Sequence, residues 1–330
     1  MSVPLSVLDQ SPIVHGASPG DAVRATIGLA KRAEELGYHR YWLAEHHALP
    51  SLADASPEVL LARLTGETSR IRLGTGGIML PHYSAFKVAE VFRMLHALAP
   101  DRIDLGVGRA PGGTRMVSAA LRSQDSNLFP QQIEDVLAYF SGDRSDARLR
   151  GLIAQPAGET SPAMWILGSS DFGARLAAEM GLPYSFAQFI GGDYPHVTHL
   201  YRDAFKPSEY LEKPHVMVTL AAIVAETDEE ADILSLPALL HRMRRLRGIV
   251  TPHPSLEEAQ AFPWTEREKA EVIASRNMII GSPNTVRPRI EELVEKYGAD
   301  EVMVVTIAPD YASRQRSYEL LAGAFAPVAA

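Results

Sequence analysis

Cysteine is absent from this chain of 330 residues. Disulfide bonds, thiolate zinc sites and cysteine nucleophiles are therefore all excluded. An excess of positive charge is also missing, because 32 basic residues face 40 acidic ones and the net charge is −8. This balance argues against a nucleic acid or a membrane surface as the main partner.

Long apolar segments are missing as well. No apolar run approaches the ~18 residues of a membrane span, and the first residues lack the charged-then-apolar pattern of a signal peptide. With 46% hydrophobic and 22% charged residues, the composition is that of an ordinary globular protein. We therefore expect a soluble, cytoplasmic protein with a large core.

The chain does contain an alternation of predicted strands and helices. β-Favouring segments, nearly all followed by a helical pattern, cover residues 4–9, 41–44, 70–80, 102–109, 163–167, 184–190, 215–225 and 301–307. The alternation predicts a parallel sheet in an α/β protein. Eight such units favour a closed (β/α)8 or TIM barrel that spans residues 1–330 as one domain.

A doubly wound open sheet is the alternative architecture. It would need a glycine-rich turn directly after the first strand. The nearest such pattern is Gly106-Val107-Gly108, which lies in the fourth unit and has its third glycine misplaced. The barrel therefore remains the better interpretation.

Two polar segments, residues 141–162 and 248–265, interrupt the alternation and predict excursions from the barrel. The second segment contains Pro252, Pro254 and Pro263 and shows no helical period. Because it follows the seventh predicted strand, it falls on the side where barrel active sites form. We expect it to be a mobile lid at the C-terminal rim.

Polar residues and glycines concentrate where the predicted strands end. Active sites of such barrels collect at the carboxyl ends of the strands, so these residues are candidates for function. They are Asp9-Gln10-Ser11, Glu45-His46-His47, Gly76-Gly77, Arg109, Gly168-Ser169-Ser170-Asp171 and Gln188.

A phosphate site is predicted at the fifth strand end. Gly168, Ser169 and Ser170 lead directly into a helix, whose free N–H groups and dipole favour an anion. Arg109 ends the preceding strand and could complete an anion clamp. Simple N-capping by serine, and a salt bridge between Arg109 and Asp171, are the alternatives.

Glu45, His46 and His47 follow the second strand and could move protons near neutral pH. Adjacent histidines on an extended chain point to opposite sides, so they form a poor zinc motif and we expect no metal site. One histidine should face the barrel mouth for proton transfer, while the other packs. Gly76-Gly77 indicates either a bulge beside a flat ligand or tight packing of a neighbour.

A basic run occupies residues 241–247 and ends at Gly248. Cations are common in the last turn of a helix before a glycine, because they interact favourably with the helix dipole. We interpret the run in this way.

These segments together resemble the bacterial-luciferase-like family of flavin-dependent monooxygenases, in its single-component-gene branch. The matching stretches are residues 42–47, 73–81, 104–109, 167–170 and 317–321. The likeness covers nearly the whole chain, and the combination is more specific than any one stretch.

The resemblance implies a barrel that binds FMN as FMNH2 and uses O2 to oxygenate a small organic substrate. It implies His46 as the catalytic histidine, with Glu45 beside it as a second catalytic candidate. Arg109 and the Gly168-Ser169-Ser170 turn would bind the flavin phosphate. Gly76-Gly77 would form a bulge, often with a cis peptide, that supports the flavin ring. A separate NAD(P)H-dependent reductase would supply the flavin, and a homodimer is expected.

Two residues depart from the family pattern. Gly108 stands where luciferase has a reactive cysteine, and Gly173 stands where relatives often have a hydroxyl residue, so one phosphate contact is expected to be missing. Two other functions stay open: an F420-dependent oxidoreductase that transfers hydride, and a non-catalytic flavin-binding protein. Retention of His46, Arg109 and the serine pair argues against the last.

Overall fold

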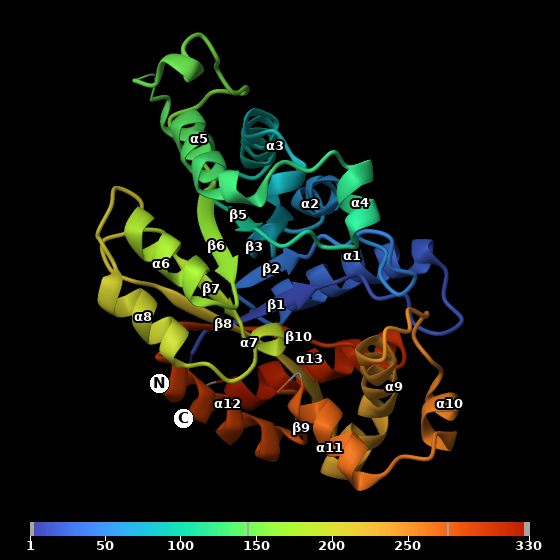
Figure 1. The fold of residues 1–330 in the computed structure, drawn as a ribbon. Helices are drawn as coiled ribbons and strands as arrows, with labels where there is room; N and C mark the ends of the chain where they lie inside the picture. The colour runs from blue at the N-terminus through green and yellow to red at the C-terminus, as the bar shows by residue number, and fades with distance from the viewer. Residues whose placement is uncertain (1–2, 144, 276, 327–330) are drawn as a thin grey trace.

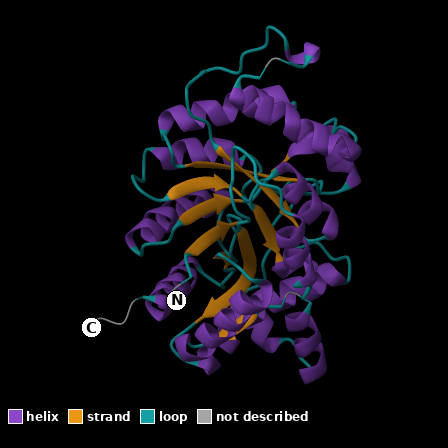
Figure 2. Ribbon diagram, turned by 90° about the vertical axis from the view of Figure 1, so that its left-hand side faces the viewer, coloured by secondary structure: helices purple, strands orange, loops and turns teal. Residues whose placement is uncertain are grey.

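A computed structural model describes residues 3–143, 145–275 and 277–326. In these residues, eight parallel strands form a closed ring, because β10 pairs with both β8 and β1. Figure 2 shows the strands gathered at the centre with helices outside them. The predicted (β/α)8 barrel is confirmed. Its strands are β1 (Leu5–Asp9), β2 (Arg40–Leu43), β3 (Arg72–Thr75), β5 (Ile103–Gly108), β6 (Ala163–Gly168), β7 (Tyr184–Ala187), β8 (Val216–Val224) and β10 (Glu301–Val305).

Two short strands supplement the ring. The predicted strand over residues 70–80 breaks at the glycine pair, so its second part is a separate strand, β4 (Ile78–Met79), paired with β5. A further strand, β9 (Ile279–Gly281), pairs with the last residues of β8 and is not among the predicted strands. Three residues are too few to show a period of two, so β9 cannot be recognised from its pattern of apolar residues.

Helices surround the ring on the outside (Figure 1). The longer ones are α1 (Pro19–Glu35), α2 (Pro57–Thr65), α3 (Ala85–Leu98), α5 (Phe129–Ser141), α6 (Asp171–Met180), α8 (His196–Ala204), α9 (Asp228–Leu246), α11 (Glu266–Ala274), α12 (Pro283–Tyr297) and α13 (Tyr311–Phe325). Shorter pieces are α4 (Arg115–Ala120), α7 (Gln188–Gly191), α10 (Leu256–Ala261) and the 3₁₀ turns Leu80–His82, Ser126–Leu128 and Ala147–Leu149.

Side chains alternate between two layers of the core, as period-2 strands require. Val7 and Tyr41 belong to the buried layer between the ring and the helices. Leu8 and Trp42, their immediate neighbours, belong to a second buried cluster together with Met303 of β10. The strands therefore present one face to the helices and the other to the barrel interior.

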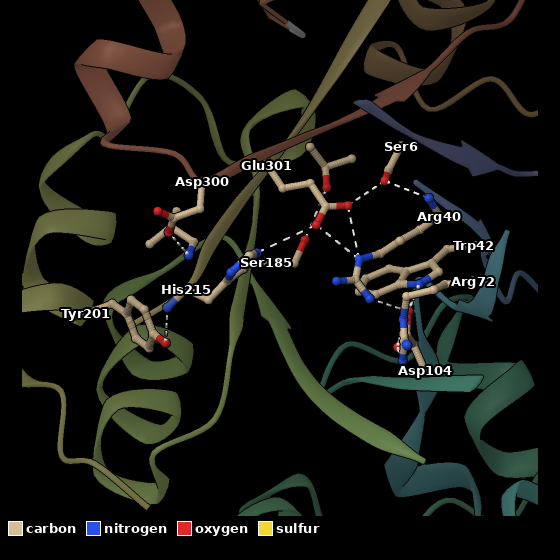
Figure 3. Close-up of polar contacts among 12 residues, drawn as sticks. Ser6, Arg40, Trp42, Arg72, Asp104, Ser185, Tyr201, His215, Asp300 and Glu301 are labelled. Carbon is tan, nitrogen blue, oxygen red and sulfur yellow. Dashed lines mark hydrogen bonds and ion pairs between the residues drawn. The ribbon is translucent and has the colours of Figure 1, made fainter. Parts of the chain in front are cut away.

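The amino end of the barrel interior is closed by charged side chains, shown in Figure 3. Arg40 forms ion pairs with Asp104 at 2.7 Å and with Glu301 at 3.0 Å, and Arg72 reaches Asp104 at 2.6 Å. Ser6 donates a further hydrogen bond to Glu301. We call these five residues the base network.

The two predicted excursions differ from each other. Of the first excursion, residues 145–162 project beyond α5 at the top of Figure 1. Residues 248–265 are more ordered than the sequence indicated, because they include α10, which packs on α9 and buries Ala259. Whether this segment moves as a lid stays a prediction. In the part of the chain that the structure describes, no helix is both long and apolar enough to cross a membrane.

Candidate active site

A cavity of about 280 Å³ lies at the carboxyl ends of the strands. Leu8, Trp42 and Met303 contribute its apolar side. Its rim contains all the residues predicted to bind a flavin: Gly76, Gly77, Arg109, Gly168, Ser169 and Ser170. The structure therefore brings these six residues together from three different β–α units. We call this space the first cavity.

The predicted phosphate end is formed by the β6–α6 turn. Ser170 is the N-cap residue of α6, yet its side chain makes no capping hydrogen bond. Arg109 lies over the ring of Phe172 at 4.0 Å. Among the described residues no carboxylate pairs with Arg109, and Asp171 instead lies 3.4 Å from His196. Serine capping and an Arg109–Asp171 salt bridge, the two alternatives, are therefore not what the structure shows.

Close packing fixes the shape of this turn. A Cβ atom at Gly173 would lie 3.4 Å from the ring of Tyr184 and 3.6 Å from the Cα of Gly168. A Cβ atom at Gly191 would lie only 2.6 Å from the Cβ of Ser169. At position 173, where relatives often have a hydroxyl residue, this chain has a glycine, and the ring of Tyr184 packs against it at the start of α6. The predicted strand over residues 184–190 is wrong after Ala187, because α7 turns the chain back toward Ser169 there.

The Gly76-Gly77 peptide bond is cis, and it separates β3 from β4. The expected irregularity of the strand and its cis peptide are confirmed, while the contact with a flavin ring stays a prediction. A Cβ atom at Gly76 would lie 2.5 Å from Leu8, and one at Gly77 would lie 2.6 Å from the carbonyl oxygen of Gly106. The site is therefore both tightly packed and next to the first cavity. A side chain at Gly77 would clash with backbone, and one at Gly76 would have to displace the Leu8 side chain.

His46 and His47 point in different directions, as predicted. His46 lines a second cavity of about 190 Å³, which shares Phe189 and Ile190 with the first. His47 turns away and approaches the Glu45 carboxylate at 2.6 Å. Of these two adjacent histidines, His46 is the one placed to exchange a proton with a molecule in the second cavity.

Glu45 is fully buried and lines neither cavity. Its carboxylate accepts hydrogen bonds from the Tyr83 hydroxyl and the Met79 backbone N–H, both at 2.9 Å, in addition to its contact with His47. The prediction of Glu45 as a group that meets substrate is not supported by this geometry. It holds the β2–α2 loop and β4 together.

A metal site at Glu45, His47 and His82 is permitted by distance, since their ligand atoms lie within 4.8 Å of one another. Both ring nitrogens of His82 already contact oxygens, however, at 2.5 Å from Ser123 and 2.7 Å from the Pro111 carbonyl. A metal ion would have to displace one of these bonds. The absence of a metal stays our prediction.

The basic run needs correction. Arg242 and Arg245 line the second cavity together with His241, so part of the run faces the barrel mouth and does more than interact with the helix dipole. Sequence alone could not reveal this, because the direction of each side chain depends on how α9 packs. Phe172, Phe189 and Ile190 were also missed, since apolar residues at helix starts carry no distinct signal.

Asp9, another polar residue at a strand end, has a structural role and does not line either cavity. It is fully buried and forms an ion pair with Arg314 at 2.7 Å. Burial alone would raise the pKa of Asp9, but the Arg314 guanidinium and the Tyr41 hydroxyl lower it. Gln10, the next residue, reaches the second cavity.

The residues of the first cavity are chemically suited to a flat ligand that carries a phosphate. One end offers a guanidinium without a carboxylate partner among the described residues, and a helix start whose serine is not engaged in capping. The middle offers backbone glycines and apolar side chains against which a flat ring can lie. The fold and the site together define a barrel enzyme with a phosphate-ready cavity at its strand ends.

Known proteins narrow this class. The model of the luciferase-like monooxygenase family matches residues 4–301. The uncharacterized protein YceB of Bacillus subtilis is 41% identical over 328 residues, which are 97% of this chain and 99% of that protein. The N-acetyl-S-alkylcysteine monooxygenase of B. subtilis is 35% identical over 327 residues, which are 97% of each chain. The crystal structure of apo-MsnO8 has a TM-score of 0.92 at 39% identity and 98% coverage of both chains.

The chain therefore belongs to the luciferase-like monooxygenase family and is an enzyme of the monooxygenase class. More distant structures share the fold alone and differ in cofactor. A 3,6-diketocamphane monooxygenase in complex with FMN has a TM-score of 0.71 at 20% identity. An F420-dependent secondary alcohol dehydrogenase has a TM-score of 0.69 at 13% identity.

Proposed function

We propose that this enzyme uses FMNH2 and O2 to oxygenate a small organic substrate, and that a separate NAD(P)H-dependent reductase supplies the flavin. The proposal depends on one observation at the end of the apolar first cavity. There Arg109 has no carboxylate partner among the described residues, and the side chain of the N-cap residue Ser170 makes no capping hydrogen bond. Bound FMNH2 would supply the electrons that activate O2.

The phosphate of the flavin would be held at the start of α6. Arg109 would donate to it from β5, with its guanidinium fixed over the Phe172 ring at 4.0 Å. The hydroxyls of Ser169 and Ser170 and the free N–H groups of α6 would complete the contacts. These charge-assisted hydrogen bonds would anchor the flavin by its phosphate and leave the flavin ring free to react.

The ring of the flavin would lie against one apolar wall of the first cavity, which the cis Gly76-Gly77 peptide and the side chains of Leu8 and Trp42 form together. Close-packed apolar walls exclude water from such a site. His46, in the adjoining cavity, would give or take one proton at a ring nitrogen while the substrate reacts. Phe189 and Ile190 border both cavities, so a substrate held beside His46 could extend toward the flavin.

F420 is the alternative cofactor. A phosphate-binding end alone does not separate two phosphorylated flavins. One relative with a named substrate, N-acetyl-S-alkylcysteine, is a monooxygenase at 35% identity, whereas the F420-dependent structure is only 13% identical. The comparison therefore favours FMN.

Titration of the purified enzyme with FMN, riboflavin and F420 tests this proposal. We expect FMN to bind more tightly than either, with aerobic turnover when a purified reductase supplies FMNH2. Turnover should place one ¹⁸O atom from ¹⁸O2 in the product. Tighter binding of F420, or a product free of ¹⁸O, would overturn it. The homodimer and the cytoplasmic location stay predictions.

A further inference from the structure

The second cavity has an unusual charge composition. Two guanidiniums and three imidazoles face it, and none of its described lining residues is acidic. The basic residues are His46, His241, Arg242, Arg245 and His253. The two guanidiniums are positive at neutral pH, and in a space of about 190 Å³ they attract an anion, because clefts focus the field of their charges.

The arginines at the end of α9 fall into two pairs. Arg244 forms an ion pair with Glu258, and Arg247 forms one with Glu268 at 3.2 Å. Arg242 and Arg245 line the cavity, and in the described part of the chain neither forms an ion pair with a carboxylate. The charges of Arg244 and Arg247 are therefore compensated by carboxylates, whereas those of Arg242 and Arg245 are available to a ligand in the cavity.

Arg242 is oriented without being neutralised. Its Nε and a terminal nitrogen donate to the side chain and the carbonyl of Ser275, at 3.2 and 3.3 Å. Both acceptors are uncharged, so they fix the guanidinium plane and leave its charge uncompensated. Burial, and then the positive charge of Arg245, lower the pKa of Arg242, which is the effect that a bound anion would reverse.

The rest of the cavity wall is mainly apolar, with Gln10 and Ser51 as its uncharged polar residues. Leu49, Leu52 and Ile307 line it, and Phe189 and Ile190 lead from it to the first cavity. A ligand that fits both features has an anionic group at one end and a hydrocarbon part at the other. A planar carboxylate matches the two-pronged donor geometry of guanidinium.

From these contacts we propose that the substrate is a small organic carboxylate, whose anionic group binds Arg242 and Arg245 while its carbon chain extends past Phe189 and Ile190 toward the flavin. This inference rests on the proposed function, of which it names the substrate class. The two arginines act here as binding residues that set specificity and orientation.

Paired ligands that differ only in charge provide the test. Hexanoate, octanoate, decanoate and N-acetyl-S-benzyl-L-cysteine would each be compared with the matching amide by calorimetric titration, in the presence of saturating FMN. At least one carboxylate should bind on the order of 10- to 100-fold more tightly than its amide, as expected for a charge-assisted contact. If no carboxylate exceeds its amide, the proposal is wrong.

Four variants locate the effect. Arg242→Gln and Arg245→Gln should each remove most of the preference for the carboxylate. Arg244→Gln and Arg247→Gln, on the same helix end, are the matched controls and should keep it. Arg245→Gln is decisive if Arg242→Gln misfolds, because the Arg245 side chain forms no ion pair within the described residues and its residue is exposed. Retention of the preference in Arg245→Gln would overturn the proposal.

FMN titration of the same variants separates this inference from the proposed function. If FMN binds but no carboxylate preference exists, only the substrate class is wrong. If the preference exists but FMN does not bind, the flavin function fails and the anion site stands. Weakened binding of FMN but not of riboflavin in Arg245→Gln would assign the arginines to the flavin phosphate and overturn the inference.

Discussion

The two ends of the barrel treat their cations in opposite ways. At the amino end, Arg40 and Arg72 are paired with Asp104 and Glu301 inside the base network (Figure 3). At the carboxyl end, Arg109, Arg242 and Arg245 line cavities, and no described carboxylate pairs with them. The same residue type thus closes one end of the barrel and leaves the other charged.

The paired arginines at the amino end should matter for stability, and the arginines at the cavities should matter for ligand binding. A buried ion pair contributes little net stability, but removal of one partner leaves a buried charge and is strongly destabilising. An arginine without a carboxylate partner at a cavity is free to meet an anionic ligand. Substitutions at the base should therefore change folding, and substitutions at the rim should change binding or turnover.

The largest effect is expected at His46. If it transfers a proton, His46→Ala should lower turnover about 10²- to 10⁴-fold while FMN affinity stays nearly unchanged, because the phosphate end lies elsewhere. His47→Ala is the comparison, since His47 contacts Glu45 and not a cavity. Steady-state rates with FMNH2 supplied by a reductase, with and without added imidazole, measure the effect. Turnover of His46→Ala near the wild-type rate would remove it from the chemistry.

Substitutions in the base network should lower the free energy of unfolding. Arg40→Met leaves the carboxylates of Glu301 and Asp104 short of a partner, so the free energy of unfolding should fall by about 3–5 kcal/mol. Arg63→Met, which removes a largely exposed pair with Glu67, should change it by less than about 0.5 kcal/mol. Urea unfolding measures both. Equal values for the two variants would contradict the contrast between the ends.

At the rim, Arg109→Ala should weaken FMN binding by about 1.5–3 kcal/mol and leave riboflavin binding nearly unchanged. The reason is that riboflavin has no phosphate for Arg109 to meet. Arg175→Ala, an exposed arginine on α6 outside the cavity, is the control. Fluorescence titration with both flavins decides the point, and equal losses for the two would place Arg109 outside the phosphate site.

The sequence predicted the strands and their polar ends because these depend on local pattern. Alternation of strands and helices, and the placement of His46, Arg109 and the serine pair after strands, are all visible without coordinates. Side-chain direction on helices is not. Arg242 and Arg244 belong to the same run, yet one faces a cavity and the other an acidic residue on α10, because the packing of α9 against its neighbours decides which face turns inward.

The break after Ala187 and strand β9 escaped prediction for a related reason. Gln188, Phe189 and Ile190 continue an apolar strand pattern, but the chain turns into α7. Glu45 shows a third limit: its polar position after a strand predicted chemistry, whereas burial and three hydrogen-bond partners give it a positioning role. Tertiary contacts override local pattern in each case.

The two ends of the barrel also differ in how a buried carboxyl group should make stability depend on pH. At the base, burial alone would raise the pKa of Glu301, but His215 and Arg40 lower it to about 2. Near the rim, burial first, and then the charge of Asp9, raise the pKa of Asp54 to about 8. The backbone carbonyl of Asp54 accepts a hydrogen bond from the backbone N–H of His46 at 3.0 Å, so Asp54 is joined directly to the loop that carries the proposed catalytic histidine.

The sign of each effect follows from proton binding. Folded Asp54 keeps its proton up to about pH 8, while the unfolded chain loses it near 3.8, so stability falls as pH rises between these values. Glu301 acts oppositely and loses its contribution only as pH falls from 4.5 toward 2. Asp54→Asn should therefore gain stability over wild type by up to about 1.4 kcal/mol per pH unit from pH 5 to 8. Urea unfolding across this range measures the gain, with the exposed Asp203→Asn as control. Parallel pH curves for Asp54→Asn and wild type would show that Asp54 is ionised in the folded enzyme and that the rim carries a buried negative charge.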